Sequence, residues 1–278
     1  MKKLIALLVS FVLGSNLTTL AQSQGAPEAT KSASRSQNIA GATKQNPFEN
    51  SLGMRFVPVP GTNVLFSIWD TRVQDYRVYG MANSKVDLTC ISPGFEQGED
   101  HPVVHVNWVE SKAFCTWLTQ KERKEGGIGQ DQEYRLPTDK EWSAAVGESE
   151  YPWGNDWPPP KGAGNYYVSL KVDDYQYTSP VGTFSANEYG LYDMGGNVYQ
   201  WCEDWYRSEM NTELFTKYPA YKDAYMPKNK FRVYRGSSWS LVAPGWLLSS
   251  ARGSARPDKC QQGFIGFRCV LASSLSPR

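Results

Sequence analysis

The stretch YGLYDMGGNV (residues 189–198) combines three glycines with aromatic and apolar side chains. Its adjacent pair, Gly195 and Gly196, suits a backbone shape that other residues do not readily adopt. The stretch lies within residues 146–230, where aromatic residues are frequent but little is periodic. A structureless span of that length is unusual in a compact domain, so we expect bound metal or disulfides to hold it.

Short motifs on both sides of this stretch follow one another in a distinctive order. Before it come NW (107–108) leading into AFC (113–115), YRLPT (134–138) followed by EW (141–142), and YPWGN (151–155). After it come Trp201, DWY (204–206), RGSSW (235–239) and GFRC (266–269). In this order the motifs resemble the formylglycine-generating enzyme, or sulfatase-modifying factor, family over roughly residues 50–272. The resemblance implies an α+β fold of the C-type-lectin-like kind, loop-rich and with few short strands.

Hydrophobic periodicity predicts about three helices. One lies near residues 71–83, and the others begin at Asn107 and at Thr138. A glutamate follows each of these two residues three positions later, which is the spacing of a capping box. The candidate strands are 54–59, 64–69, 231–235 and 265–271.

The N-terminal region is expected to lie outside the folded domain. Residues 1–21 have the layout of a cleavable signal peptide, with two lysines, an apolar run and small residues near the cut. That run is shorter than the roughly 20 apolar residues that a membrane span requires. Residues 22–46 are small and polar and predict a flexible linker, which leaves residues 47–275 as the domain. We therefore expect an exported protein, periplasmic or secreted, with no membrane span.

The charge balance argues against two classes of partner. The chain has 29 basic and 28 acidic residues, and two of the lysines lie in the predicted signal peptide. The mature chain is therefore almost neutral, which gives no electrostatic basis for binding nucleic acid or an anionic membrane.

The resemblance implies two structural calcium sites. In the first, the side chains of Asp193 and Gln200 and the carbonyls of Gly196 and Val198 are the ligands. A glutamate is usual in the family where Gln200 stands, whereas Asp193 replaces a residue that is usually neutral. Calcium prefers such mixtures of carboxylate and carbonyl oxygens.

The second implied calcium site involves Asn165, Tyr166, Asp173 and Tyr175. Asn165 and Asp173 would contribute side chains, and Tyr166 and Tyr175 would contribute carbonyls. At both places the alternative is that the acidic residues are solvated loop residues without a metal.

Five cysteines lie beyond the predicted signal peptide: Cys90, Cys115, Cys202, Cys260 and Cys269. Export permits disulfides, and the odd number leaves at least one thiol without a partner in the chain. The resemblance implies a structural disulfide between Cys115 and Cys269. Cys260 either pairs with Cys90 or Cys202 or remains free.

The family's oxidase chemistry requires two thiols shortly after its Arg-Gly-Gly-Ser motif. These thiols bind copper(I), activate oxygen and convert a substrate cysteine to formylglycine. Here the motif reads RGSSWSLVAPGW (235–246), and no cysteine occurs between Cys202 and Cys260. Soft thiolates suit copper(I), so hydroxyl groups do not replace them and we expect no copper. Some relatives use a three-histidine iron centre, but this chain has only His101 and His105, for which a hydrogen-bonding role is favoured.

Two functions remain open from the sequence. In the first, the protein is a binding or accessory domain for a peptide or another extracytoplasmic ligand. The family cleft would be formed by Ser238, Trp239 and Tyr199, because aromatic rings with a few polar groups suit such a groove. In the second, it is an oxidoreductase that modifies a protein or a small molecule, including formylglycine generation on sulfatases. The sequence does not specify the ligand or the oligomeric state.

Overall fold

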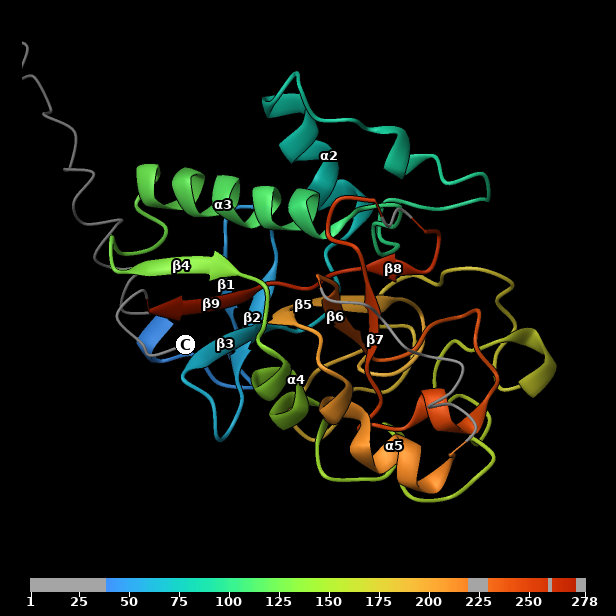
Figure 1. Cartoon of the computed structure of the whole chain (residues 1–278). Helices are drawn as coiled ribbons and strands as arrows, with labels where there is room; N and C mark the ends of the chain where they lie inside the picture. The colour runs from blue at the N-terminus through green and yellow to red at the C-terminus, as the bar shows by residue number, and fades with distance from the viewer. Residues whose placement is uncertain (1–38, 220–229, 260–261, 274–278) are drawn as a thin grey trace, which may run out of the picture.

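The computed structural model describes residues 39–219, 230–259 and 262–273 (Figure 1). The described residues contain four α-helices: α2 (Val73–Ala82), α3 (Trp108–Lys124), α4 (Asp139–Val146) and α5 (Thr212–Lys217). The first three confirm the predicted helices. The short helix α5 lies in the span for which the sequence predicted no regular structure.

The nine strands of the described residues are short and form two sheets. The five-stranded sheet has the order β1 (Phe48–Glu49), β2 (Arg55–Pro58), β3 (Val64–Ser67), β9 (Val270–Ser273), β4 (Gln132–Arg135). The four-stranded sheet has the order β7 (Gly253–Ala255), β6 (Arg232–Arg235), β5 (Tyr199–Trp205), β8 (Ile265–Gly266). The architecture is the loop-rich α+β fold that the sequence predicts.

Strand β9, from the C-terminal part of the domain, is the fourth strand of the five-stranded sheet and pairs with β3 from the N-terminal part. It lies between β3 and β4 and is antiparallel to both, with Leu271 opposite Leu65 on one side and Tyr134 on the other. Adjacent residues of a strand point to opposite faces of the sheet. Leu271 therefore packs in the core cluster that contains side chains of α3, whereas Val270 packs in the cluster that contains side chains of α4. The five-stranded sheet is thus covered by a helix on each face.

The predicted strand 265–271 is two strands in different sheets. β8 pairs parallel to β5, and β9 pairs with β3 and β4. The chain crosses between the sheets at Arg268, whose fully buried guanidinium donates hydrogen bonds to the carbonyls of Ser67 and Tyr192. A single continuous strand was therefore the wrong prediction, because these contacts hold the residues between β8 and β9 out of either ladder.

Both predicted capping boxes are present. Asn107 Oδ1 accepts a hydrogen bond from the Glu110 amide at 2.9 Å, and Glu110 Oε2 accepts one from the Asn107 amide at 2.7 Å. Thr138 and Glu141 exchange the equivalent pair at the start of α4. These bonds satisfy amide donors that the first turn of each helix leaves free.

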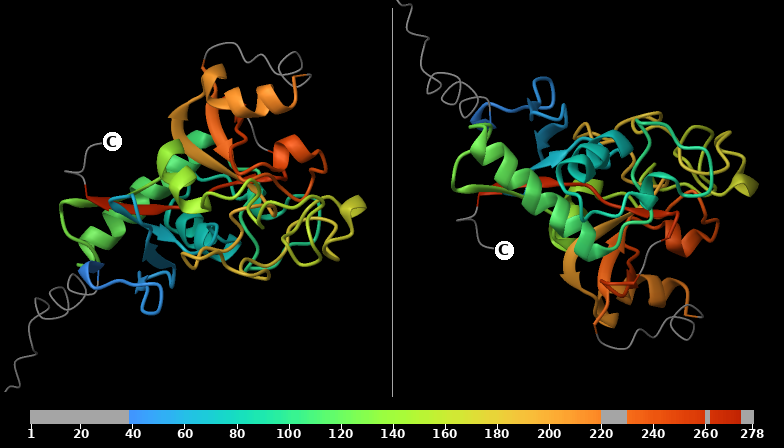
Figure 2. Two further views of the ribbon diagram at one scale, coloured as in Figure 1. Left: turned by 90° about the horizontal axis from the view of Figure 1, so that it is seen from below. Right: turned by 90° about the horizontal axis from the view of Figure 1, so that it is seen from above.

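The residues between α4 and β5 form loops. In both views of Figure 2 the loops of residues 155–190 lie at the end of the molecule away from strand β9. They surround a third core cluster that includes Tyr151, Tyr166 and Leu247. The motif at 189–198 leads from these loops into β5, and β6 leads into RGSSW, so the two motifs lie next to each other.

Contacts of the folded domain begin before the predicted boundary at residue 47. Ile39 and Ala42 pack against the core, and Lys44 Nζ donates a hydrogen bond to the carbonyl of Glu188 at 2.9 Å. The last residues of the predicted linker, 39–46, are therefore part of the domain. The predicted signal peptide lies outside the described residues. Within those residues, no helix has both the length and the apolar character needed to span a bilayer.

Candidate functional site

Trp239, from the motif RGSSW, is the centre of an aromatic cluster. Its ring lies edge-on to those of Tyr177 and Phe95, at centroid distances of 5.2 and 6.1 Å. Phe95 and Tyr177 stack on each other at 4.6 Å. The indole Nε1 of Trp239 donates to the carbonyl of Gly263 at 2.9 Å and fixes the ring orientation.

Three exposed apolar side chains lie around Leu241, two residues after Trp239 in the chain. The Tyr167 amide donates to the Leu241 carbonyl at 3.1 Å, which brings Tyr167 and Val168 beside Val242. Tyr167, Val168 and Val242 are all more than 40% exposed. We call the following residues the aromatic patch: Phe95, Tyr167, Val168, Tyr177, Trp239 and Val242. Contiguous exposed apolar side chains mark binding surfaces more often than single ones do.

Two of the three residues predicted to form the cleft are buried. Ser238 is completely buried, and its Oγ lies 2.9 Å from Ser240 Oγ. Tyr199 is 6% exposed and packs against Tyr234 at a ring distance of 4.5 Å. Only Trp239 extends towards the surface, so the three residues do not form one open cleft.

Phe95 and Tyr177 were not predicted as site residues. Both lie in loops without periodicity, and each is more than 60 residues from Trp239 in the chain. No local pattern marks them, although a tyrosine directly before the Thr-Ser-Pro turn at 178–180 was available as a weak signal.

The second implied calcium site has an oxygen suited to a cation. Asn165 is fully buried, and its Nδ2 donates to the Tyr177 carbonyl at 2.7 Å, while its Oδ1 has no hydrogen-bond partner. The two oxygens of Asp173 accept from the amides of Tyr166 and Tyr175 at 2.9 and 2.8 Å. Burial raises the pKa of Asp173 despite these two bonds. A buried amide oxygen without a partner, and a carboxylate bonded to the amide of the next residue, are oxygens of the kind that a hard cation takes.

The first implied calcium site differs, because the Gln200 side chain is already bound at both ends. Its Oε1 accepts from Trp142 Nε1 and from Arg268 Nε, each at 2.8 Å. Its Nε2 donates to the Asp193 carbonyl at 2.7 Å. The carboxylate of Asp193 accepts from the Gly182 amide at 2.8 Å.

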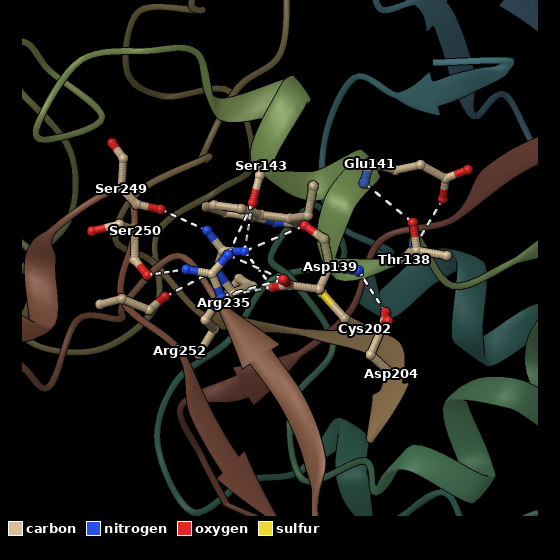
Figure 3. A network of polar contacts seen from close by, with 12 residues as sticks. Thr138, Asp139, Glu141, Ser143, Cys202, Asp204, Arg235, Ser249, Ser250 and Arg252 are labelled. Atoms are coloured by element: carbon tan, nitrogen blue, oxygen red, sulfur yellow. Dashed lines mark hydrogen bonds and ion pairs between the residues drawn. The ribbon is translucent and has the colours of Figure 1, made fainter. Parts of the chain in front are cut away.

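Residues 249–252 lie against an ion cluster at the start of α4 (Figure 3). Asp139 binds the guanidinium groups of Arg235 and Arg252. Arg235 also donates to the carbonyls of Ala251 and Ser249, at 2.9 and 2.6 Å. Both arginines thereby fasten residues 249–252 to the start of α4.

Charges in this cluster stabilise one another. Burial alone raises the pKa of Asp139, but the positive charges of Arg235 and Arg252 outweigh it and hold the pKa below its ordinary value. Burial lowers the pKa of Arg235 to about 10, although Asp139 opposes that shift. The donors of both arginines are largely used by protein oxygens, so the cluster is a structural clamp.

The four described cysteines are buried as free thiols. Cys115 Sγ and Cys269 Sγ lie 3.5 Å apart, so the predicted partners are neighbours, although the structure contains no bond between them. Burial raises the pKa of Cys90 to about 12 and that of Cys202 well above its ordinary value. Cys260 lies outside the described residues, so its pairing is not tested.

His101 and His105 do not lie on one strand. Residues 101–105 form no strand, and His105 has a left-handed backbone (φ 55°). His101 Nδ1 lies 2.9 Å from Thr178 Oγ1, in a hydrogen bond. Among the described residues, no group of three or more histidines, cysteines or acidic residues is arranged to hold a metal. That finding does not bear on a calcium site built largely from carbonyl and amide oxygens.

Comparison with known proteins gives a match over most of the chain. Residues 28–273 match the model of the family described as "Sulfatase-modifying factor enzyme 1-like domain". The chain is 34% identical over 188 residues to the formylglycine-generating enzyme of Thermomonospora curvata, which covers 62% of this chain and 55% of that protein. It is 32% identical over 197 residues to the inactive C-alpha-formylglycine-generating enzyme 2 of Bos taurus, which covers 66% and 54%. The chain thus spans about half the length of these relatives.

Solved structures show the same fold. PvdO from Pseudomonas aeruginosa superposes with a TM-score of 0.56 at 26% identity, over 75% of this chain and 80% of that one. CarF superposes with a TM-score of 0.53 at 20% identity, over 79% and 87%. At that identity the similarity to CarF concerns the fold alone.

Proposed function

Because the chain belongs to the sulfatase-modifying factor family, we propose that it is an exported member that binds a peptide and lacks the family's thiol–copper oxidase chemistry. One observation carries the proposal. The segment after RGSS contains hydroxyl, apolar and glycine residues where the family's two thiols are expected.

The remaining described thiols do not supply a substitute. Copper(I) binds thiolates, and a thiol must lose its proton to become one. Burial raises the pKa of Cys90 to about 12, and it raises the pKa values of Cys115 and Cys202 well above their ordinary values. These groups therefore stay protonated near neutral pH, inside the core.

The relatives do not decide between the two functions. One is named as a formylglycine-generating enzyme, and another of similar identity is named as inactive. Family membership is therefore compatible with a binding function and with an oxidoreductase function. The residues at the site are what distinguishes the two.

The aromatic patch supports peptide binding. Trp239 is held by its bond to Gly263, and Phe95 and Tyr177 are held by mutual stacking, so the rings lose little freedom when a ligand binds. Rigid aromatic rings beside exposed aliphatic groups suit the apolar side chains of a peptide. The nearly neutral mature chain adds no preference for a strongly charged ligand.

Calcium at Asn165 and Asp173 belongs to the same proposal. The Asn165 Oδ1, which has no hydrogen-bond partner, would be a ligand of a cation bound there. The cation would thereby hold in place the loop that carries Tyr177. The role is structural, because a hard cation between two loops replaces contacts that the loops cannot make themselves.

The proposed lack of oxidase activity is tested with a substrate peptide. The purified mature protein is incubated with a Cys-x-Pro-x-Arg peptide, copper and oxygen, and the product is analysed by mass spectrometry. The formylglycine-generating enzyme of Thermomonospora curvata serves as the positive control. We expect the peptide incubated with the control enzyme to show the mass decrease that accompanies conversion of cysteine to formylglycine. The peptide incubated with this protein should keep its original mass.

The same mass loss with this protein would establish the alternative, an oxidoreductase of the family. The Cys260→Ser variant would then show whether the one cysteine outside the described residues supplies the chemistry. Loss of activity in that variant would identify Cys260 as a participant, and retention would point to the buried thiols.

Export is tested separately. The layout of residues 1–21 predicts cleavage after Ala21. Expression in a bacterial host should give a periplasmic or secreted protein whose N-terminal sequence begins at Gln22, and an uncleaved cytoplasmic product would contradict the proposal.

A further inference from the structure

The orientation of the Gln200 side chain is fixed by its neighbours. Gln200 is fully buried on β5, and its Oε1 receives hydrogen bonds from Trp142 Nε1 and Arg268 Nε at 2.8 Å each. An indole nitrogen and a guanidinium nitrogen are donors and never acceptors. A flipped amide would set its NH₂ group against two donors, so only one orientation satisfies the network.

The NH₂ group therefore faces the loop 193–200. Nε2 donates to the Asp193 carbonyl at 2.7 Å, in a bond that ties the start of the loop to its end. A hard cation takes oxygen ligands, and an amide nitrogen whose lone pair is delocalised does not serve as one. The glutamate that is usual in the family has oxygen at both positions, so it binds the same two donors and still presents an oxygen to the loop.

Other contacts close the loop without a metal. Arg268, also fully buried, donates to the carbonyls of Tyr192 and Asp193 at 2.7 and 3.3 Å. The Gly196 amide donates to the Gly236 carbonyl at 2.8 Å. Arg268 also places its positive charge 3.6 Å from the buried Asp70 carboxylate.

We infer that the Gln200 amide closes the loop 193–200 in place of a cation, so that this loop does not bind calcium. Gln200 is thus the residue that sets the metal dependence of the loop. The Asn165 site, in contrast, keeps a buried oxygen without a partner, so the two implied sites differ in their capacity for calcium. Of the two implied sites, only the Asn165 site is therefore expected to bind calcium.

Calcium binding to the purified mature protein tests the inference by isothermal titration and by equilibrium dialysis. The wild-type protein should bind no more than one ion. Asp173→Asn should abolish binding, because it removes the carboxylate of the Asn165 site. Gln200→Glu in the Asp173→Asn background should restore one ion, whereas the matched change Gln120→Glu, on the exposed face of α3, should restore none.

Thermal unfolding gives a second measurement that is independent of any activity. With a chelator present, Gln200→Glu should unfold at a lower temperature than the wild type and should recover on addition of calcium. The Asp173→Asn protein, which keeps Gln200, should unfold at the same temperature with chelator and with calcium.

Two results would overturn the inference: two ions bound by the wild type, or one ion retained by Asp173→Asn. If the wild type binds no ion, the inference for this loop is supported, and the Asn165 site does not bind calcium either. If Gln200→Glu does not fold, the wild type and Asp173→Asn still decide the question, because the inference concerns the loop as it stands.

Discussion

Cys115 Sγ lies 3.5 Å from Cys269 Sγ, and the contact connects α3 to the residue directly before β9, across 154 residues of chain. Both side chains are buried beside Tyr76, Phe114 and Leu271. A disulfide has its sulfurs about 2.0 Å apart, so a small rotation of either side chain would bring the two within bonding distance.

We predict that this pair forms a disulfide in the exported protein. The bond should stabilise the domain by up to about 5 kcal/mol, because it closes a very long loop in the unfolded chain. Titration of thiols in denaturant, before and after reduction, should show at least two more thiols after reduction. Reduction should also lower the unfolding temperature.

Matched variants separate this pair from the other thiols. Cys269→Ser should remove the response to reductant, whereas Cys90→Ser should leave it intact. Five titratable thiols in the unreduced exported protein would disprove the bond.

The Asp139 clamp predicts loss of stability in acid. The folded-state pKa of Asp139 is depressed, because Arg235 and Arg252 outweigh the effect of burial. A depressed pKa gives stability that is fully present above the ordinary pKa of an aspartate. That stability is lost as the pH falls through the folded-state pKa.

Asp139→Asn should therefore destabilise the protein near neutral pH, by about 3 kcal/mol or more, because it leaves the buried Arg235 and the partly buried Arg252 without their counter-ion. The difference from the wild type should shrink as the pH falls, in urea unfolding measured from neutral to acid pH. Glu49→Gln, which breaks an exposed ion pair with Arg55, should change stability by less than about 1 kcal/mol at any pH. A constant gap between Asp139→Asn and the wild type at every pH would show that the clamp does not act through its charge.

Removing a capping side chain should cause a measurable loss of stability. Thr138→Ala removes the side chain that accepts from the Glu141 amide at 3.1 Å, and should cost about 1 kcal/mol. Thr138→Ser keeps the oxygen and should lie within a few tenths of a kcal/mol of the wild type. Equal losses in the two variants, measured by urea unfolding, would mean that the methyl group and not the cap is responsible.

Two of the helices could be predicted from the sequence because the capping residues that begin them lie close together in the chain. Asn107 and Thr138 each bind a residue only three positions away, so the signal is contained within one turn. Strand β5, with the sequence YQWCEDW, escaped prediction. Its first four residues are all buried and a register shift follows Trp201, so no alternation of polar and apolar residues is present.

The site could be predicted only in part, because it is made of long-range contacts. Family resemblance identified Gln200 as the departure at the first calcium site. Its orientation depends on Trp142 and Arg268, which are 58 and 68 residues away in the chain. The aromatic patch likewise gathers Phe95, Tyr177 and Trp239 from three separate loops, and no local pattern connects them.

The aromatic patch makes its own prediction, which contrasts two tyrosines. Tyr177 is 37% exposed and stacks on Phe95, whereas Tyr199 is buried against Tyr234. Tyr177→Ala should weaken binding of a peptide selected from a random display library on the wild type. The loss should be about 2 kcal/mol, which is about thirtyfold in Kd, with little change in the unfolding temperature.

Tyr199→Ala should have the opposite effect. Loss of a buried aromatic side chain costs about 3 to 5 kcal/mol of stability, so the unfolding temperature should fall while the folded fraction binds the peptide normally. Trp205→Ala is the control for an exposed aromatic residue elsewhere, since Trp205 stacks on Arg232 and not on the patch. Fluorescence anisotropy of the labelled peptide measures Kd for each variant. Binding that survives Tyr177→Ala but fails in Trp205→Ala would move the peptide site away from Trp239, because only the first variant changes a ring in contact with it.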